Sequence, residues 1–245
     1  MTGGFQTGGG DRHAFLTGPN GVGYTVLGTL GGQENQASGI NASGQVTGTP
    51  YISGNLQAHA YITGADGVSM KDVGTLFLNS YASGINDAGQ VVGFSDVADG
   101  TNHAFMTGPD GVGMTDLGTL GGKFSQSLAI NDLGEVVGTA LTASDSRWHS
   151  FIYSHGGMTD LSLLAPVVAA GWSNLSVSDI NNNGQIVGSG MINGEYAGFL
   201  LSYTPDTLFA PNPIFMPPIP IPEPQTYLML LAGLGLVGFM ARRRK

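Results

Sequence analysis

The chain has 245 residues, of which 41 are glycine, none is cysteine and 10% are charged, and its formal net charge is −9. The absence of cysteine excludes disulfides and cysteine-based zinc sites. An acidic chain is also unsuited to nucleic acid, whose phosphates require Lys and Arg. Short apolar runs bounded by Gly, Asn, Asp and Pro predict an all-β domain rich in turns.

Three short phrases recur in register along residues 1–203. The first is Ile-Asn-x-x-Gly-Gln-Val-Val-Gly or a close variant, and its copies begin at Ile40, Ile85, Ile130 and Ile180, with spacings of 45, 45 and 50 residues. The second is His-Ala-Phe or a variant, and its copies begin at His13, His59, His103 and His149, with a degenerate copy at 197–200. The third is Leu-Gly-Thr-Leu or a variant, within 27–32, 72–76, 116–122 and 160–164. Such repetition predicts stacked copies of one supersecondary unit.

Each copy is predicted to form four antiparallel strands. In the copy at 80–120, we expect strands at 81–85, 90–95, 103–107 and 113–118, with tight turns at 86–89 and 108–111. Val91 is adjacent to Val92 and Ala104 to Phe105, and neighbours along a strand point to opposite faces. Both faces of each sheet should therefore be buried by stacking. Repeated four-stranded meanders predict a β-propeller, with a β-solenoid or stacked-sheet array as the alternative.

The three phrases, in this order, resemble the HAF-repeat family of extracellular bacterial proteins, named for His-Ala-Phe. The resemblance covers residues 1–203, which we assign as a HAF-type β-repeat domain. Because the biochemical role of that family is largely undefined, the resemblance implies a location outside the cell rather than an activity.

The first copy is predicted to begin inside a strand. Gly3 lies as far before His13 as Gly93 lies before His103, so residue 1 takes the place of a strand residue. A basic and apolar secretory leader is not found ahead of it. We expect a fragment, or a start at an internal Met, preceded upstream by a further strand and a leader. The last copy, 175–203, supplies three strands, and an upstream strand could complete it.

The recurring polar residues are interpreted as structural. A catalytic group is needed once, whereas a packing or hydrogen-bonding group is needed in every copy. The residues so assigned are His13, His59, His103, His149, Asn41, Asn86, Asn131 and Asn181. The Asn turns could instead gather oxygen ligands for calcium, but they lack a full ligand set. Asp72, Asp116 and Asp160 are expected to cap local backbone.

No catalytic residue, metal site or cofactor is assigned, and we expect a protein that is not an enzyme. The alternative function is a carbohydrate- or ligand-binding propeller. It would use the loops 141–147 and 165–173, which differ between copies, together with Trp148 and Trp172. The simpler expectation for both Trp side chains is packing in the β core.

The C-terminal residues are predicted to form a sorting tail. Residues 204–221 are a Pro-rich linker, and Pro222, Glu223 and Pro224 precede an apolar run at 226–241. The run ends in the basic residues Arg242, Arg243, Arg244 and Lys245. Sixteen residues of helix span roughly 24 Å, short of a roughly 30 Å hydrocarbon core. Four of the eight cations and one of the seventeen acids lie after residue 221, which leaves 4 bases and 16 acids, a net −12, before it.

The tail at 222–245 resembles the PEP-CTERM signal of Gram-negative bacteria. The resemblance implies export, a transient membrane position through residues 226–241, and processing near Pro222–Pro224 by an exosortase, a membrane transpeptidase. An anchor that is never cut is the alternative. By the same resemblance, we expect a cell-surface or extracellular-matrix protein that accompanies exopolysaccharide and biofilm material.

Overall fold

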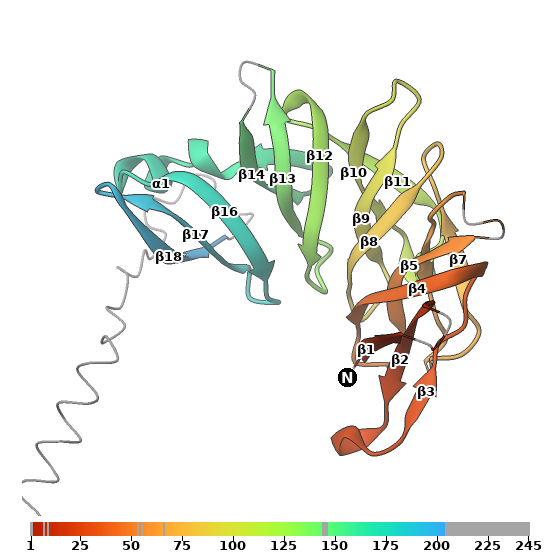
Figure 1. Ribbon diagram of the computed structural model, residues 1–245. Coiled ribbons are helices and arrows are strands. Elements are labelled where there is room, and N and C mark those ends of the chain that lie inside the picture. Colours follow the sequence, from red (N-terminus) through yellow and green to blue (C-terminus); the bar gives the residue numbers. More distant parts are fainter. Residues whose placement is uncertain are drawn as a thin grey trace, which may run out of the picture. The chain divides into compact units, whose positions relative to one another are not determined.

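The computed structural model describes residues 2–203 apart from 7, 9, 53, 55, 66 and 144–146. These residues belong to one compact unit, and the predicted linker, apolar segment and sorting tail lie outside them. Five antiparallel sheets follow one another along the chain, each a meander of consecutive strands (Figure 1). The prediction of an all-β fold built from repeated meanders is therefore confirmed.

The strand bounds follow the repeats. The first sheet contains β1 (Thr2–Gln6), β2 (Arg12–Thr17) and β3 (Tyr24–Val26), and the second β4 (Gly31–Ile40), β5 (Val46–Ile52), β6 (Ala60–Ile62) and β7 (Lys71–Gly74). The third contains β8 (Ser80–Ile85), β9 (Val91–Asp96), β10 (Asn102–Thr107) and β11 (Met114–Gly118). The fourth contains β12 (Gly121–Ile130), β13 (Val136–Thr142), β14 (Trp148–Ser154) and β15 (Gly157–Asp160), and the fifth β16 (Ser173–Ile180), β17 (Gln185–Ile192) and β18 (Glu195–Ser202).

Short helical turns connect some of the strands. They are the 3₁₀ turns Pro19–Gly21, Pro109–Gly111 and Leu161–Leu163, and the α-helix α1 (Ala165–Ala169), which lies within the predicted loop 165–173. The strands of the third sheet match the predicted ones to within one residue at each end. The first strand of the chain pairs Gly3 with Phe15, as β9 pairs Gly93 with Phe105. Residues 2–6 therefore occupy the second-strand position, as the spacing predicted.

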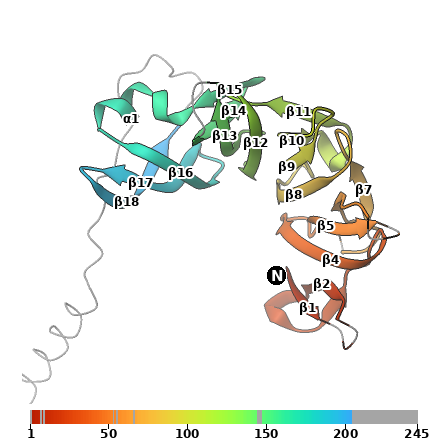
Figure 2. The same ribbon diagram turned by 45° about the horizontal axis from the view of Figure 1, so that its top comes forward.

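Four apolar clusters lie between neighbouring sheets, whose order is visible in both views (Figures 1 and 2). Val91 belongs to the cluster between the second and third sheets, and Val92 to the cluster between the third and fourth. Val136 and Val137 divide in the same way. The second, third and fourth sheets are thus buried on both faces, as expected, whereas the first and fifth each contribute to one cluster among the described residues. Sheets of this kind packed face to face form the blades of a β-propeller.

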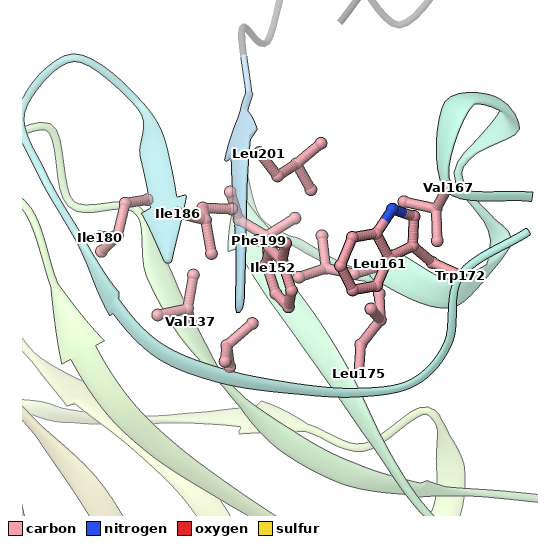
Figure 3. Close-up of a cluster of buried hydrophobic side chains, with 11 residues drawn as sticks. Val137, Ile152, Leu161, Val167, Trp172, Leu175, Ile180, Ile186, Phe199 and Leu201 are labelled. Carbon is pink, nitrogen blue, oxygen red and sulfur yellow. The ribbon is translucent and has the colours of Figure 1, made fainter. Parts of the chain in front are cut away.

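The cluster between the fourth and fifth sheets contains the buried Trp172, whose ring meets Phe199 edge-on with centroids 5.7 Å apart (Figure 3). Packing was the right prediction for this residue. It was wrong for Trp148, which is 47% exposed on β14.

The glycine that ends the first phrase is required by close backbone approach. A Cβ at Gly93 would lie 1.8 Å from the carbonyl oxygen of Tyr81, where the register between β8 and β9 shifts. Such a shift is a β-bulge, which brings an extra residue of one strand against its partner. The same contact recurs at 1.9 Å for Gly48 and 2.1 Å for Gly138.

Candidate functional site

The repeated histidines tie the third strand of a sheet to the fourth. The Nδ1 atoms of His59, His103 and His149 lie 2.7, 2.8 and 2.8 Å from carboxylate oxygens of Asp72, Asp116 and Asp160. The other oxygen of each Asp accepts a backbone N–H two residues on, as the expected capping role requires. In the first sheet Val26 stands where the Asp would be, and His13 lies beside the Phe5 ring instead.

The repeated asparagines form a hydrogen-bond ladder that crosses from each repeat to the next. Asn86 shows the pattern: its Nδ2 donates to Gln90 Oε1 at 2.8 Å within its own turn and to the backbone oxygen of Asn131 at 3.0 Å in the next repeat. The equivalent bond between repeats runs from Asn41 to Asn86 and from Asn131 to Asn181. The ladder explains the conserved spacing of the phrase within this chain without any bound ion.

A second polar link between repeats uses a buried serine. Ser125 Oγ accepts the N–H of Ala104 at 2.8 Å and donates to the carbonyl oxygen of Gly118, both in the preceding repeat. Between the fourth and fifth sheets, the hydroxyl belongs to the earlier of the two sheets instead. Ser150, at the position equivalent to Ala104, donates to the backbone oxygen of Leu175 at 2.7 Å. Leu175 is the fifth-sheet equivalent of Ser125 and has no hydroxyl. Ser150 of the variant His-Ser-Phe phrase supplies the hydroxyl in its place.

These repeated contacts stabilise the fold. We therefore look for a binding site among the residues that differ from one copy of the repeat to the next. In the part of the chain that the structure describes, no three His, Asp or Glu side chains gather as metal ligands would. A hollow of about 720 Å³ lies over β1, β4, β5, β8 and β9. Its volume is within the roughly 300–1,000 Å³ of small-molecule sites.

Aromatic rings line this hollow, which we call the aromatic groove. Tyr81 on β8 and Phe94 on β9 are direct cross-strand partners, and their rings stack with centroids 4.8 Å apart and planes at 18°. Both are half-buried, whereas Tyr51 is 41% and Phe5 39% exposed. The corresponding pairs elsewhere are polar: Gln36 with Thr49, Gln126 with Thr139, and Ser176 with Ser189.

Polar and charged side chains complete the groove. Arg12 and Glu34, both exposed, line it together with Gln6, Gln36 and Ser38. Burial, followed by the neighbouring Asp96 carboxylate and Tyr51, raises the pKa of the Tyr81 phenol above its ordinary value. Tyr81 therefore presents a neutral ring and an O–H donor across the physiological range.

This groove was not predicted from the sequence. The alternative prediction, a ligand-binding propeller, relied on Trp148, Trp172 and the loops 141–147 and 165–173. Trp172 is core, and residues 144–146 lie outside the described part of the chain. The available signal was the departure of Tyr81 and Phe94 from the polar residues of the other copies.

The comparisons with known proteins bear on the tail and the fold. Residues 220–245 match the PEP-CTERM protein-sorting motif. The chain therefore carries the signal of an exported bacterial envelope or surface protein that an exosortase sorts. A comparison with curated proteins found no match.

Among solved structures, the chain is similar to the β-propeller domain of the Trilobed protease from Pyrococcus furiosus, described as having an open velcro topology. The TM-score is 0.40 and the identity 6%, over 80% of this chain and 76% of the other. No helix among the described residues has the length and apolar character needed to cross a bilayer.

Proposed function

We propose that the protein is a non-enzymatic, HAF-type repeat protein of the Gram-negative cell surface or extracellular matrix, associated with exopolysaccharide and biofilm material. The PEP-CTERM motif at residues 220–245 carries this proposal, because it marks the chain for export and exosortase processing. The order of Pro222-Glu223-Pro224, apolar run and basic end supports cleavage near the tripeptide.

The repeat domain supports a structural rather than a catalytic role. Its recurring His, Asp and Asn side chains are engaged in bonds that repeat from sheet to sheet, as in His103–Asp116 and Asn86–Asn131. A net charge of −12 before residue 222 favours solubility outside the cell and disfavours adsorption to anionic lipid.

The test is processing in the native host with and without its exosortase gene. We expect a tail-less form in the surface or secreted fraction, lost when the exosortase is deleted. The double substitution Pro222→Ala and Pro224→Ala should block processing, whereas Pro211→Ala, in the linker and outside the matched motif, should leave it unchanged. Equal processing of the double variant, or a tail retained in the wild-type host, would overturn the proposal.

A further inference from the structure

We propose that the aromatic groove binds an uncharged hexopyranose chain, such as a β-linked glucan. This inference rests on the proposed function, since it names the kind of exopolysaccharide that the surface protein would hold.

The stacked pair is the first reason. An aromatic side chain that is left accessible beside a hollow is informative, because a large ring is normally buried in a core. Tyr81 and Phe94 lie side by side on one face of the sheet, and Tyr51 on the neighbouring sheet is more exposed still. Equatorially substituted pyranoses present flat C–H faces that pack on such rings. No other described repeat carries an aromatic pair at this position, so packing between repeats does not require one.

The polar lining is the second reason. Sugar hydroxyls both donate and accept, and the groove offers both kinds of partner. The Arg12 guanidinium donates, the Glu34 carboxylate accepts, and the Gln36 amide does both. A groove built to bind an apolar peptide face would not need opposite charges at its rim.

The charge of the groove and of the surrounding protein distinguishes neutral from anionic sugars. Arg12 and Glu34 are the charged residues among the described lining residues, and their charges cancel. The chain before residue 222 carries a net −12, which repels a polyuronate at long range. An uncharged chain avoids this penalty, so a neutral glycan fits the groove better than an anionic one.

A β-strand is the competing occupant, because the outer edge of β1 also borders the groove. Exposed strand edges pair readily with further strands. A strand at this edge would cover the aromatic rings, so this alternative predicts no sugar binding. If the strand came from a second copy, the protein would also be a dimer.

The test is isothermal titration of the full-length protein, in a zwitterionic detergent that carries no sugar headgroup. The probe is the β-1,4-linked glucose hexasaccharide, with a β-1,4-linked mannuronate hexamer as the anionic counterpart. We expect the glucose probe to bind, and Tyr81→Ala or Phe94→Ala to weaken it by about tenfold or more, as the loss of a binding hot spot does. Tyr81→Phe keeps the ring and should stay within about threefold, a change under 1 kcal/mol.

Tyr196→Ala is the matched control, because Tyr196 is 77% exposed on β18 and lies outside the groove. It should bind like the wild type. Tyr51→Ala removes an exposed ring and gives a second groove variant should Tyr81→Ala fail to fold, and it should also weaken binding.

Four outcomes would overturn the inference: no binding by the wild type, binding unaffected by both Tyr51→Ala and Phe94→Ala, equal binding of the mannuronate hexamer, or a dimer that excludes the glucose probe. The assay uses purified protein, so its failure is distinct from a failure of exosortase processing in the host.

Discussion

The asparagine ladder gives a prediction that the chain can test against itself. Asn86 is buried, and its side chain makes three hydrogen bonds: to Gln90 Oε1, from Gln90 N, and to the backbone oxygen of Asn131 in the next repeat. Asn181 occupies the same place in the last repeat, is exposed, and bonds within its own turn to Gln185 and Asn183.

The two Ala substitutions should therefore differ. At about 0.5–1.5 kcal/mol per bond, Asn86→Ala should lower the free energy of unfolding by roughly 2–4 kcal/mol, since it removes three hydrogen bonds in a buried place. The Asn131 oxygen keeps the N–H of Gly134 as a partner. Asn181→Ala removes bonds that water can replace, and should cost about 1 kcal/mol or less. The difference, on the order of 2 kcal/mol, measures the contact between repeats.

Urea unfolding followed by far-UV circular dichroism measures both variants against the wild type. The urea dependence of the free energy should be unchanged, so that the shift in midpoint reports stability alone. Equal losses for the two variants, or a larger loss for Asn181→Ala, would refute the claim that the ladder joins the repeats.

Two further predictions concern single packing sites. Gly93→Ala places a methyl 1.8 Å from the Tyr81 carbonyl oxygen, and should lower the free energy of unfolding by more than about 3 kcal/mol or prevent folding. Gly28→Ala is the control, because open space surrounds Gly28, and it should change the melting temperature little. Similar melting temperatures for the two variants would contradict the close approach at Gly93. Tyr61→Phe removes a buried hydroxyl that makes no hydrogen bond of ordinary length, and the Asn35 side chain only partly offsets the effect of burial on its pKa. The substitution should therefore stabilise the protein by about 1 kcal/mol. Burial raises the pKa of Tyr61 above its ordinary value of 10, so the folded state keeps a proton that the unfolded state loses. Wild-type stability should thus fall as the pH rises above 10, and a fall of the same size in Tyr61→Phe would show that this phenol is not responsible.

Much of the fold could be predicted from the sequence, because each copy of the repeat gives a separate indication of where the strands and turns lie. Val91 and Val92 predicted two buried faces, and the structure assigns them to two different clusters. The glycine of each phrase is recognisable as a repeated position, but the reason for it, the approach of the Tyr81 carbonyl to Gly93, depends on a bulge that composition does not reveal.

The sites between strands were less accessible to sequence reasoning. His103 and Asp116 were considered separately, because their contact depends on the register between β10 and β11. Tyr81 and Phe94 are 13 residues apart in sequence and meet only through the pairing of β8 with β9. Comparison of the copies position by position, rather than phrase by phrase, would have shown both as departures from the repeat.

Removal of the tail by an exosortase can be measured directly on the exported protein. The most direct measurement is the intact mass of the mature protein recovered from the surface and secreted fractions of its native host. A C-terminus close to Pro224 is the predicted result. A mass that retains Arg242, Arg243, Arg244 and Lys245 would show that the tail is not removed.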